Sequence, residues 1–125
     1  MKFSGPPLRR SHGMLAVFIV FALAATAFAH ISLDKADPAV GATVKASPSQ
    51  VKITFTGEAT SATIEVINAE GKQVDKKDTV LDAKDKAVAA VSVAQLPPGT
   101  YKVQWHAVSI DTHKSEGTFS FTIEK

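Results

Sequence analysis

The sequence predicts an all-β fold, an antiparallel Greek-key sandwich or barrel of seven strands. Apolar and polar residues alternate with a period of two along most of the chain after residue 30, as in "VKITF" at 51–55. Seven segments of this kind follow one another within about 100 residues, which is the usual size of such sandwiches. No segment after residue 30 has a helical period of useful length, so helices are not expected in the core.

The first 29 residues have the layout of a cleaved signal peptide. Three basic residues precede an uninterrupted apolar run, "LAVFIVFALAA" at 15–25, and a small, any, small pattern follows at 27–29. The uncharged stretch at 14–29 is 16 residues long, shorter than the roughly 20 residues that span a bilayer. We therefore expect export, with cleavage after Ala29 and His30 as the first residue of the mature protein.

The remaining part of the chain suits one domain with one core. Removing residues 1–29 leaves 125 − 29 = 96 residues, with 14 − 3 = 11 basic and 12 acidic side chains. A nearly neutral domain without a basic block gives no reason to expect nucleic acid or an anionic membrane surface as partner. The chain has no cysteine and both methionines lie in the leader, so residues 30–125 contain no sulfur and no disulfide stabilises the fold.

Each of the seven strands has its own local signals. We place the strands, in chain order, at residues 31–36, 50–57, 61–68, 72–80, 86–94, 101–109 and 117–124. The segment "AVGATVKASP" after the first strand is expected to be a connection, "NAEG" at 68–71 a hairpin turn, and "LPPGT" at 96–100 a stiff corner. The last two strands supply the predicted core residues Tyr101, Val103, Trp105, Phe119, Phe121 and Ile123. Together these signals favour an immunoglobulin-like sandwich.

The order of the strands predicts which loops meet. Successive connections of an antiparallel sandwich alternate between its two ends, so the loops after strands two, four and six lie at the end where the first strand begins. These loops are residues 57–61, 81–85 and 109–116. We therefore expect His30 to lie close to the loop that contains Asp111 and His113.

This arrangement predicts a copper site. Residues i and i+2 of an extended backbone point to the same side, so Asp111 and His113 can be directed at one point. An N-terminal His30 would add its α-amine and one ring nitrogen, which close a chelate ring. Three nitrogens and one oxygen suit Cu(II), whereas the thioether and thiolate ligands of Cu(I) are absent. The spacing thus predicts one Cu(II) per chain, and an ordinary solvated Asp–His pair remains the alternative at this point.

Three longer stretches resemble the periplasmic copper-resistance protein CopC family: "HISLDKADPAVGATVKASPSQVKITFTGE", "LPPGTYKVQW" and "AVSIDTHKSEGTFSFTI". The resemblance covers nearly all of residues 30–125 and implies a small β-sandwich or barrel, cupredoxin-like in broad shape, that binds copper in the periplasm. It implies Cu(II) ligands at His30, Asp111 and His113. Family members that also hold Cu(I) use a methionine-rich stretch, which is missing here, so the chain resembles the Cu(II)-only type.

The same resemblance bears on two further residues and on partners. Glu58 stands where some members place an acidic group near the Cu(II) site, which makes it a candidate outer or weak ligand or else a plain loop glutamate. His106 follows the inward-facing Trp105 and is expected on the surface. The expected partners are the copper ion and an inner-membrane copper transport protein of the CopD type, and the protein is expected to be a monomer.

These observations predict a non-catalytic Cu(II) carrier or chaperone in copper resistance, homeostasis or uptake, and not an enzyme. Two alternatives come from other classes of protein. A copper oxygenase with an N-terminal histidine brace also starts at a processed histidine, but it needs a second histidine where a carboxylate stands here, and an exposed substrate face. An immunoglobulin-like interaction module without metal is the other alternative.

Overall fold

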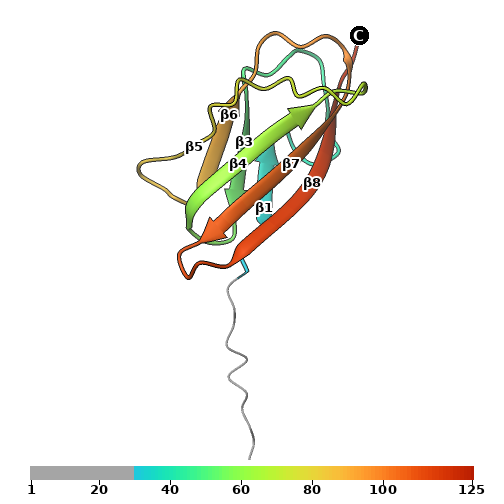
Figure 1. Cartoon of the computed structure of the whole chain (residues 1–125). Coiled ribbons are helices and arrows are strands. Elements are labelled where there is room, and N and C mark those ends of the chain that lie inside the picture. The colour runs from blue at the N-terminus through green and yellow to red at the C-terminus, as the bar shows by residue number, and fades with distance from the viewer. Residues whose placement is uncertain (1–29) are drawn as a thin grey trace, which may run out of the picture.

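Two four-stranded β-sheets face each other in the computed structural model, which describes residues 30–125 (Figure 1). The first sheet has the order β1-β3-β6-β5, with bounds Leu33–Asp37, Gln50–Phe55, Val88–Ser92 and Val80–Leu81. The second sheet has the order β2-β8-β7-β4, with bounds Thr43–Val44, Lys114–Ile123, Gly99–Ser109 and Ala59–Ile67. The predicted signal peptide at 1–29 lies outside the described residues. The predicted β-sandwich is confirmed.

The core lies between the two sheets and is made of inward-facing side chains from alternate strand positions. All six predicted core residues of β7 and β8 are buried. The Phe55 and Trp105 rings meet across the sheets with centroids 5.3 Å apart. Gly117 faces Trp105 so closely that a Cβ on residue 117 would lie 2.7 Å from the indole ring. The large indole therefore fits only because its cross-strand neighbour has no side chain.

Residues 30–125 contain eight strands, so the predicted count of seven is wrong. The segment expected to be only a connection contains β2, a two-residue strand that runs parallel to β8. Three backbone hydrogen bonds hold it there, from Gly41 N to Ser120 O, from Thr122 N to Ala42 O and from Glu124 N to Val44 O. A strand of two residues has no readable alternation, and its partner is about 80 residues away, so the local pattern could not reveal it.

The predicted strand at 72–80 is also wrong, because only isolated bridges at Gln73 and Asp75 and the short β5 occur there. The carboxylate of Asp75 is buried and accepts hydrogen bonds from the backbone N–H groups of Val66 (2.8 Å) and Lys77 (3.0 Å). Lys77 has a φ of 58°. A side chain therefore takes the place of the regular backbone ladder along this segment.

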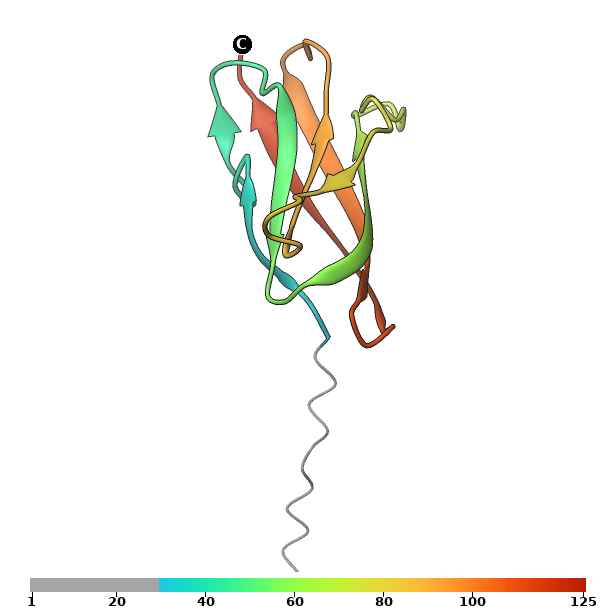
Figure 2. The same ribbon diagram turned by 90° about the vertical axis from the view of Figure 1, so that its left-hand side faces the viewer.

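Despite these errors, the predicted meeting of the loops is confirmed. The turn between β3 and β4 and the turn between β7 and β8 both lie at the end where the described chain begins (Figures 1 and 2). Thr56 N donates to Ser32 O (2.9 Å) and Ala59 N donates to Lys86 O (3.0 Å) at this end. The prediction holds because the short β2 runs in the same direction as β1 and therefore adds no reversal of the chain. Residues 68–81, although they are not a regular strand, still lead the chain back to the end where β1 begins. The chain therefore runs along the sandwich seven times.

Within residues 30–125 there is no helix long and apolar enough to cross a membrane. All strands and all buried apolar residues of the two sheets lie between Ile31 and Ile123.

Replacing Asp75 by alanine is expected to destabilise residues 30–125 by about 1–3 kcal/mol, because the buried N–H of Val66 loses its acceptor. Urea unfolding followed by the fluorescence of Trp105 measures this loss. Asp34→Ala, at an exposed position of β1, is the matched control and should change stability little. Equal unfolding midpoints for the two variants would contradict the role of Asp75.

Asp78 gives the fold a pH-dependent contribution. Ser92 N donates to Oδ1 of Asp78 (2.8 Å), and the hydrogen bonds from Ser92 lower the pKa of this carboxyl below its ordinary value of 3.8. The stabilisation is present above the ordinary pKa and is lost as the pH falls through the lower pKa of the folded state. Between about pH 6 and about pH 2.5, the urea midpoint of the wild type should therefore fall further than that of Asp78→Asn. Equal decreases in the two proteins would exclude this contribution.

Candidate metal centre

The turn that joins β7 to β8 is closed by the backbone of Ser109. Thr112 N donates to Ser109 O (2.9 Å), and Ser109 N donates to His113 O (2.9 Å). Thr112 has a φ of 71°, in the left-handed region that residues other than glycine rarely adopt. The extended backbone predicted for this segment is wrong, because residues 110–113 form a tight turn.

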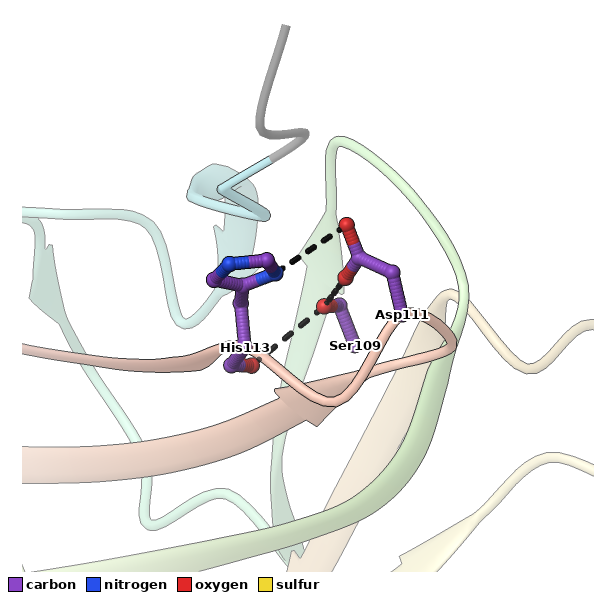
Figure 3. A network of polar contacts seen from close by, with 3 residues as sticks. All are labelled: Ser109, Asp111 and His113. Carbon is purple, nitrogen blue, oxygen red and sulfur yellow. Dashed lines mark hydrogen bonds and ion pairs between the residues drawn. The ribbon is translucent and has the colours of Figure 1, made fainter. Parts of the chain in front are cut away.

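This turn brings together the two side chains that the sequence analysis paired. Nδ1 of His113 lies 3.1 Å from Oδ2 of Asp111 (Figure 3). The hydroxyl of Ser109 donates a hydrogen bond to the other carboxylate oxygen, Oδ1. The Asp111 side chain is 46% exposed and that of His113 is 37% exposed, so both can be reached from solvent.

The same contacts determine the charge of Asp111. The hydrogen bond from Ser109, and after it the contact with His113, hold the pKa of Asp111 below its ordinary value of 3.8. The carboxyl group is therefore ionised at any pH near neutrality and can serve as an anionic ligand. Burial acts in the opposite direction on the pKa of Asp111 but does not outweigh these two contacts.

His30 lies beside this turn, although it is about 80 residues away in the sequence. The rings of His30 and His113 meet edge to face, with centroids 5.6 Å apart and an interplanar angle of 71°. The next residue, Ile31, is buried in the core, and Ser32 N donates to Thr56 Oγ1 (3.0 Å). His30 is exposed, but the two residues after it fix where its backbone enters the sandwich.

Glu58 occupies the turn between β3 and β4, at the same end of the sandwich as His30. Its side chain is exposed, and it is not a member of the network in Figure 3, which joins Ser109, Asp111 and His113. The adjacent Gly57 has a structural reason to be there, since a Cβ would lie 3.1 Å from Cγ2 of Ile31. Glu58 thus lies at the expected end of the fold, and its part in metal binding stays a prediction.

His106 lies on the outer face of the second sheet, as expected. Its side chain is 54% exposed, and Nδ1 lies 3.2 Å from Oε2 of Glu116 on the neighbouring strand β8. The histidine is therefore a surface residue with a carboxylate partner, on a different face from the end that carries His30.

Side chains of types that can ligate metals lie close together at this end, but among residues 30–125 they are not arranged around a common point. Among residues 30–125 there is no group of three or more His, Cys, Asp or Glu side chains with the geometry of a metal site. The donors fit a divalent transition metal that prefers nitrogen and oxygen, because they comprise two imidazoles and an ionised carboxylate. A free α-amine on His30 would complete a set of three nitrogens and one oxygen.

Ser109 is the residue of this site that the sequence analysis did not identify. Its side chain is 3% exposed, and it forms hydrogen bonds with its backbone and its hydroxyl to the residues of the turn. The signal was present in the sequence as "SIDTH", in which Ser109, Asp111 and His113 alternate. A serine near the end of a strand is common, however, and the spacing alone did not distinguish it from a packing residue.

Comparison with known proteins gives a consistent result. The family model described as CopC domain matches residues 33–124, a range that contains Asp111 and His113 but begins after His30. The copper transport protein CutJ of Bacillus subtilis (strain 168) is 33% identical over 115 residues, which cover 90% of this chain. The aligned part spans 21% of the length of CutJ.

Two solved structures are similar in fold and sequence. CopC from Methylosinus trichosporium OB3b has a TM-score of 0.71 and 29% identity, over 76% of this chain and 94% of that one. PcoC, a methionine-rich copper resistance protein from Escherichia coli, has a TM-score of 0.64 and 27% identity, over 76% of this chain and 99% of that one. The family model matches 124 − 33 + 1 = 92 of the 125 residues, so the chain belongs to the CopC domain family.

Proposed function

We propose that residues 30–125 form a periplasmic protein that binds one Cu(II) ion through the α-amine and ring of His30, Asp111 and His113, and that carries or holds it without catalysing a reaction. The main support is the position of the three residues. His30 and His113 have ring centroids 5.6 Å apart, and His113 lies 3.1 Å from Asp111. His30 and the turn between β7 and β8, about 80 residues apart in the sequence, thus meet at one exposed end of the sandwich.

The family supports copper as the metal, and the composition supports Cu(II). CutJ is named a copper transport protein and PcoC a copper resistance protein, and this chain is similar to both. PcoC is described as methionine-rich, whereas residues 30–125 here contain neither methionine nor cysteine. Cu(I) prefers soft sulfur ligands, while Cu(II) accepts nitrogen and oxygen in a tetragonal arrangement. A role in copper resistance, homeostasis or uptake follows from this chemistry.

The structure favours a carrier over an oxygenase with a histidine brace. Every phenylalanine, tyrosine and tryptophan of residues 30–125 is buried in the core, namely Phe55, Tyr101, Trp105, Phe119 and Phe121. An exposed aromatic surface for stacking a substrate is therefore missing from this part of the chain. An exposed metal site at the end of a rigid sandwich suits the transfer of an ion to another protein, and we propose an inner-membrane transport protein of the CopD type as the recipient.

We further propose how the N-terminus of the mature chain is formed and what its oligomeric state is. Cleavage after Ala29 is required, because the backbone nitrogen of His30 is an amine only if no residue precedes it. We propose that the protein acts as a monomer and that Glu58 is at most an outer partner of the site.

Loss of an outer partner of a metal site lowers the metal affinity roughly 10–100-fold. Adding Gly-Ser in front of His30 removes a ligand itself and is therefore expected to weaken Cu(II) binding by more than this. The reason is that an acylated nitrogen cannot close the chelate ring with the imidazole. Competition with a chelator of known affinity, followed by the fluorescence of Trp105, measures the change. The matched control carries Gly-Ser after Lys125 and should bind as the unextended protein does. Equal affinities for the two extended proteins would falsify the N-terminal chelate.

The affinity for Cu(II) is expected to fall steadily as the pH is lowered from about 8 to about 5, because imidazole and amine nitrogens bind a metal only when deprotonated. Isothermal titration in buffers of known copper affinity measures this dependence. Binding should also release protons, which can be counted by repeating the titration in buffers with different ionisation enthalpies. An affinity that does not change over this range would exclude histidine and amine ligands.

A further inference from the structure

Ser109 is one of only two polar or charged residues that are buried within residues 30–125, the other being Asp75. Its side chain is 3% exposed, yet it lies directly beneath the exposed Asp111. A buried hydroxyl needs a hydrogen-bond partner, and here the partner is a carboxylate of the candidate metal centre. The position of Ser109 is therefore explained by its contact with Asp111.

The backbone and the hydroxyl of Ser109 have separate roles. The backbone closes the turn through its bonds with Thr112 and His113. The hydroxyl donates to Oδ1 of Asp111 and lies 3.3 Å from the backbone oxygen of His113 (Figure 3). Alanine at this position would keep the hydrogen bonds between backbone groups and remove the contacts of the hydroxyl with Asp111 and with the backbone oxygen of His113.

This bond places the two carboxylate oxygens of Asp111 in different surroundings. Oδ1 is held by a buried group of the sandwich, whereas Oδ2 faces His113 at 3.1 Å. Rotation of the carboxylate would break this bond, and Oδ2 is the oxygen that faces His113 in the candidate metal centre. Hydrogen bonds of this kind to ligating carboxylates orient them and raise metal affinity.

We propose that Ser109 is a positioning residue of the metal centre, which holds Oδ1 of Asp111 so that Oδ2 binds Cu(II) as a single oxygen ligand. The inference rests on the proposed function, because it needs Asp111 to be a ligand. On binding, Oδ2 exchanges its contact with His113 for the metal ion, while Oδ1 stays with Ser109. Without the hydroxyl, the carboxylate is free to turn and its preorganisation is lost.

The test compares Ser109→Ala with Ser115→Ala on residues 30–125 starting at His30. Ser115 lies two residues after His113, and its buried Oγ has no hydrogen-bond partner among the described residues, so it is a matched control. We expect Ser109→Ala to weaken Cu(II) binding roughly 10–100-fold and Ser115→Ala to leave it unchanged. Urea unfolding should show both variants to be folded, because neither substitution removes a hydrogen bond between two backbone groups.

Two further measurements separate positioning from a general structural effect. In Asp111→Ala the affinity should fall, and adding Ser109→Ala to that variant should cause no further loss, because Ser109 acts only through the carboxylate. The electron paramagnetic resonance spectrum of bound Cu(II) should change in its parallel g value and hyperfine splitting in Ser109→Ala and not in Ser115→Ala. Ser109→Thr retains the hydroxyl and should restore the wild-type spectrum.

The outcomes distinguish this inference from the proposed function. Wild-type affinity and spectrum in Ser109→Ala would overturn the role of Ser109 and leave Cu(II) binding intact. The same would follow if Ser109→Ala weakened binding equally with and without Asp111, or if Ser109→Thr behaved as the alanine variant does. If the wild-type protein did not bind Cu(II), the proposed function and the inference would both be overturned.

Discussion

The antiparallel ladder between β7 and β8 is the constraint on which the rest of the structure depends. It runs from the pair Gly99 and Ile123 to the pair Val108 and Lys114. The ladder fixes which side chains face the core, because neighbouring residues of a strand point to opposite sides. It also fixes the position of the turn at its end, so the residues that pack the interior and the residues that form the candidate metal centre belong to the same hairpin. A shift of one residue in this register would turn Trp105 to the surface and move Asp111 and His113.

The stability of the sandwich and the chemistry of its end are largely separate. Residues 30–125 have no cysteine, so the apolar contacts between the sheets and the backbone ladders stabilise the fold without a disulfide. His30, Asp111 and Glu58 are exposed at one end, and none of them is part of this core. The core therefore does not include these residues of the candidate metal centre. Ser109 is the connection between the two parts, since it is buried with the core and bonded to Asp111.

The sequence was sufficient for the sandwich, its core and the meeting of His30 with the turn between β7 and β8, because all three follow from the alternation of long strands. The alternation of Tyr101, Val103 and Trp105 could be read directly, and their burial confirms it. Features that depend on contacts between distant residues could not be read. Strand β2 exists only through its pairing with β8, and Asp75 replaces backbone pairing by a side-chain bond to Val66. The contact between Ser109 and Asp111 was missed for a related reason, since it needs the turn at Thr112, whose φ of 71° no local pattern predicts.

The segment at 72–79 that was mistaken for a strand has a consequence for association between molecules. Strand β4 is nine residues long and lies at the edge of its sheet, and an open edge of that length offers hydrogen bonds to a strand of another copy. Here Val66 N is bonded to Asp75, and Ile64 N is bonded to the hydroxyl of Thr79 (3.0 Å). The side chains of Asp75 and Thr79 thus occupy backbone N–H groups at the edge of this sheet. A regular strand in their place would have paired with β4, but it would itself have become the new open edge. The irregular segment therefore occupies backbone donors of β4 that a strand of another copy would need for pairing.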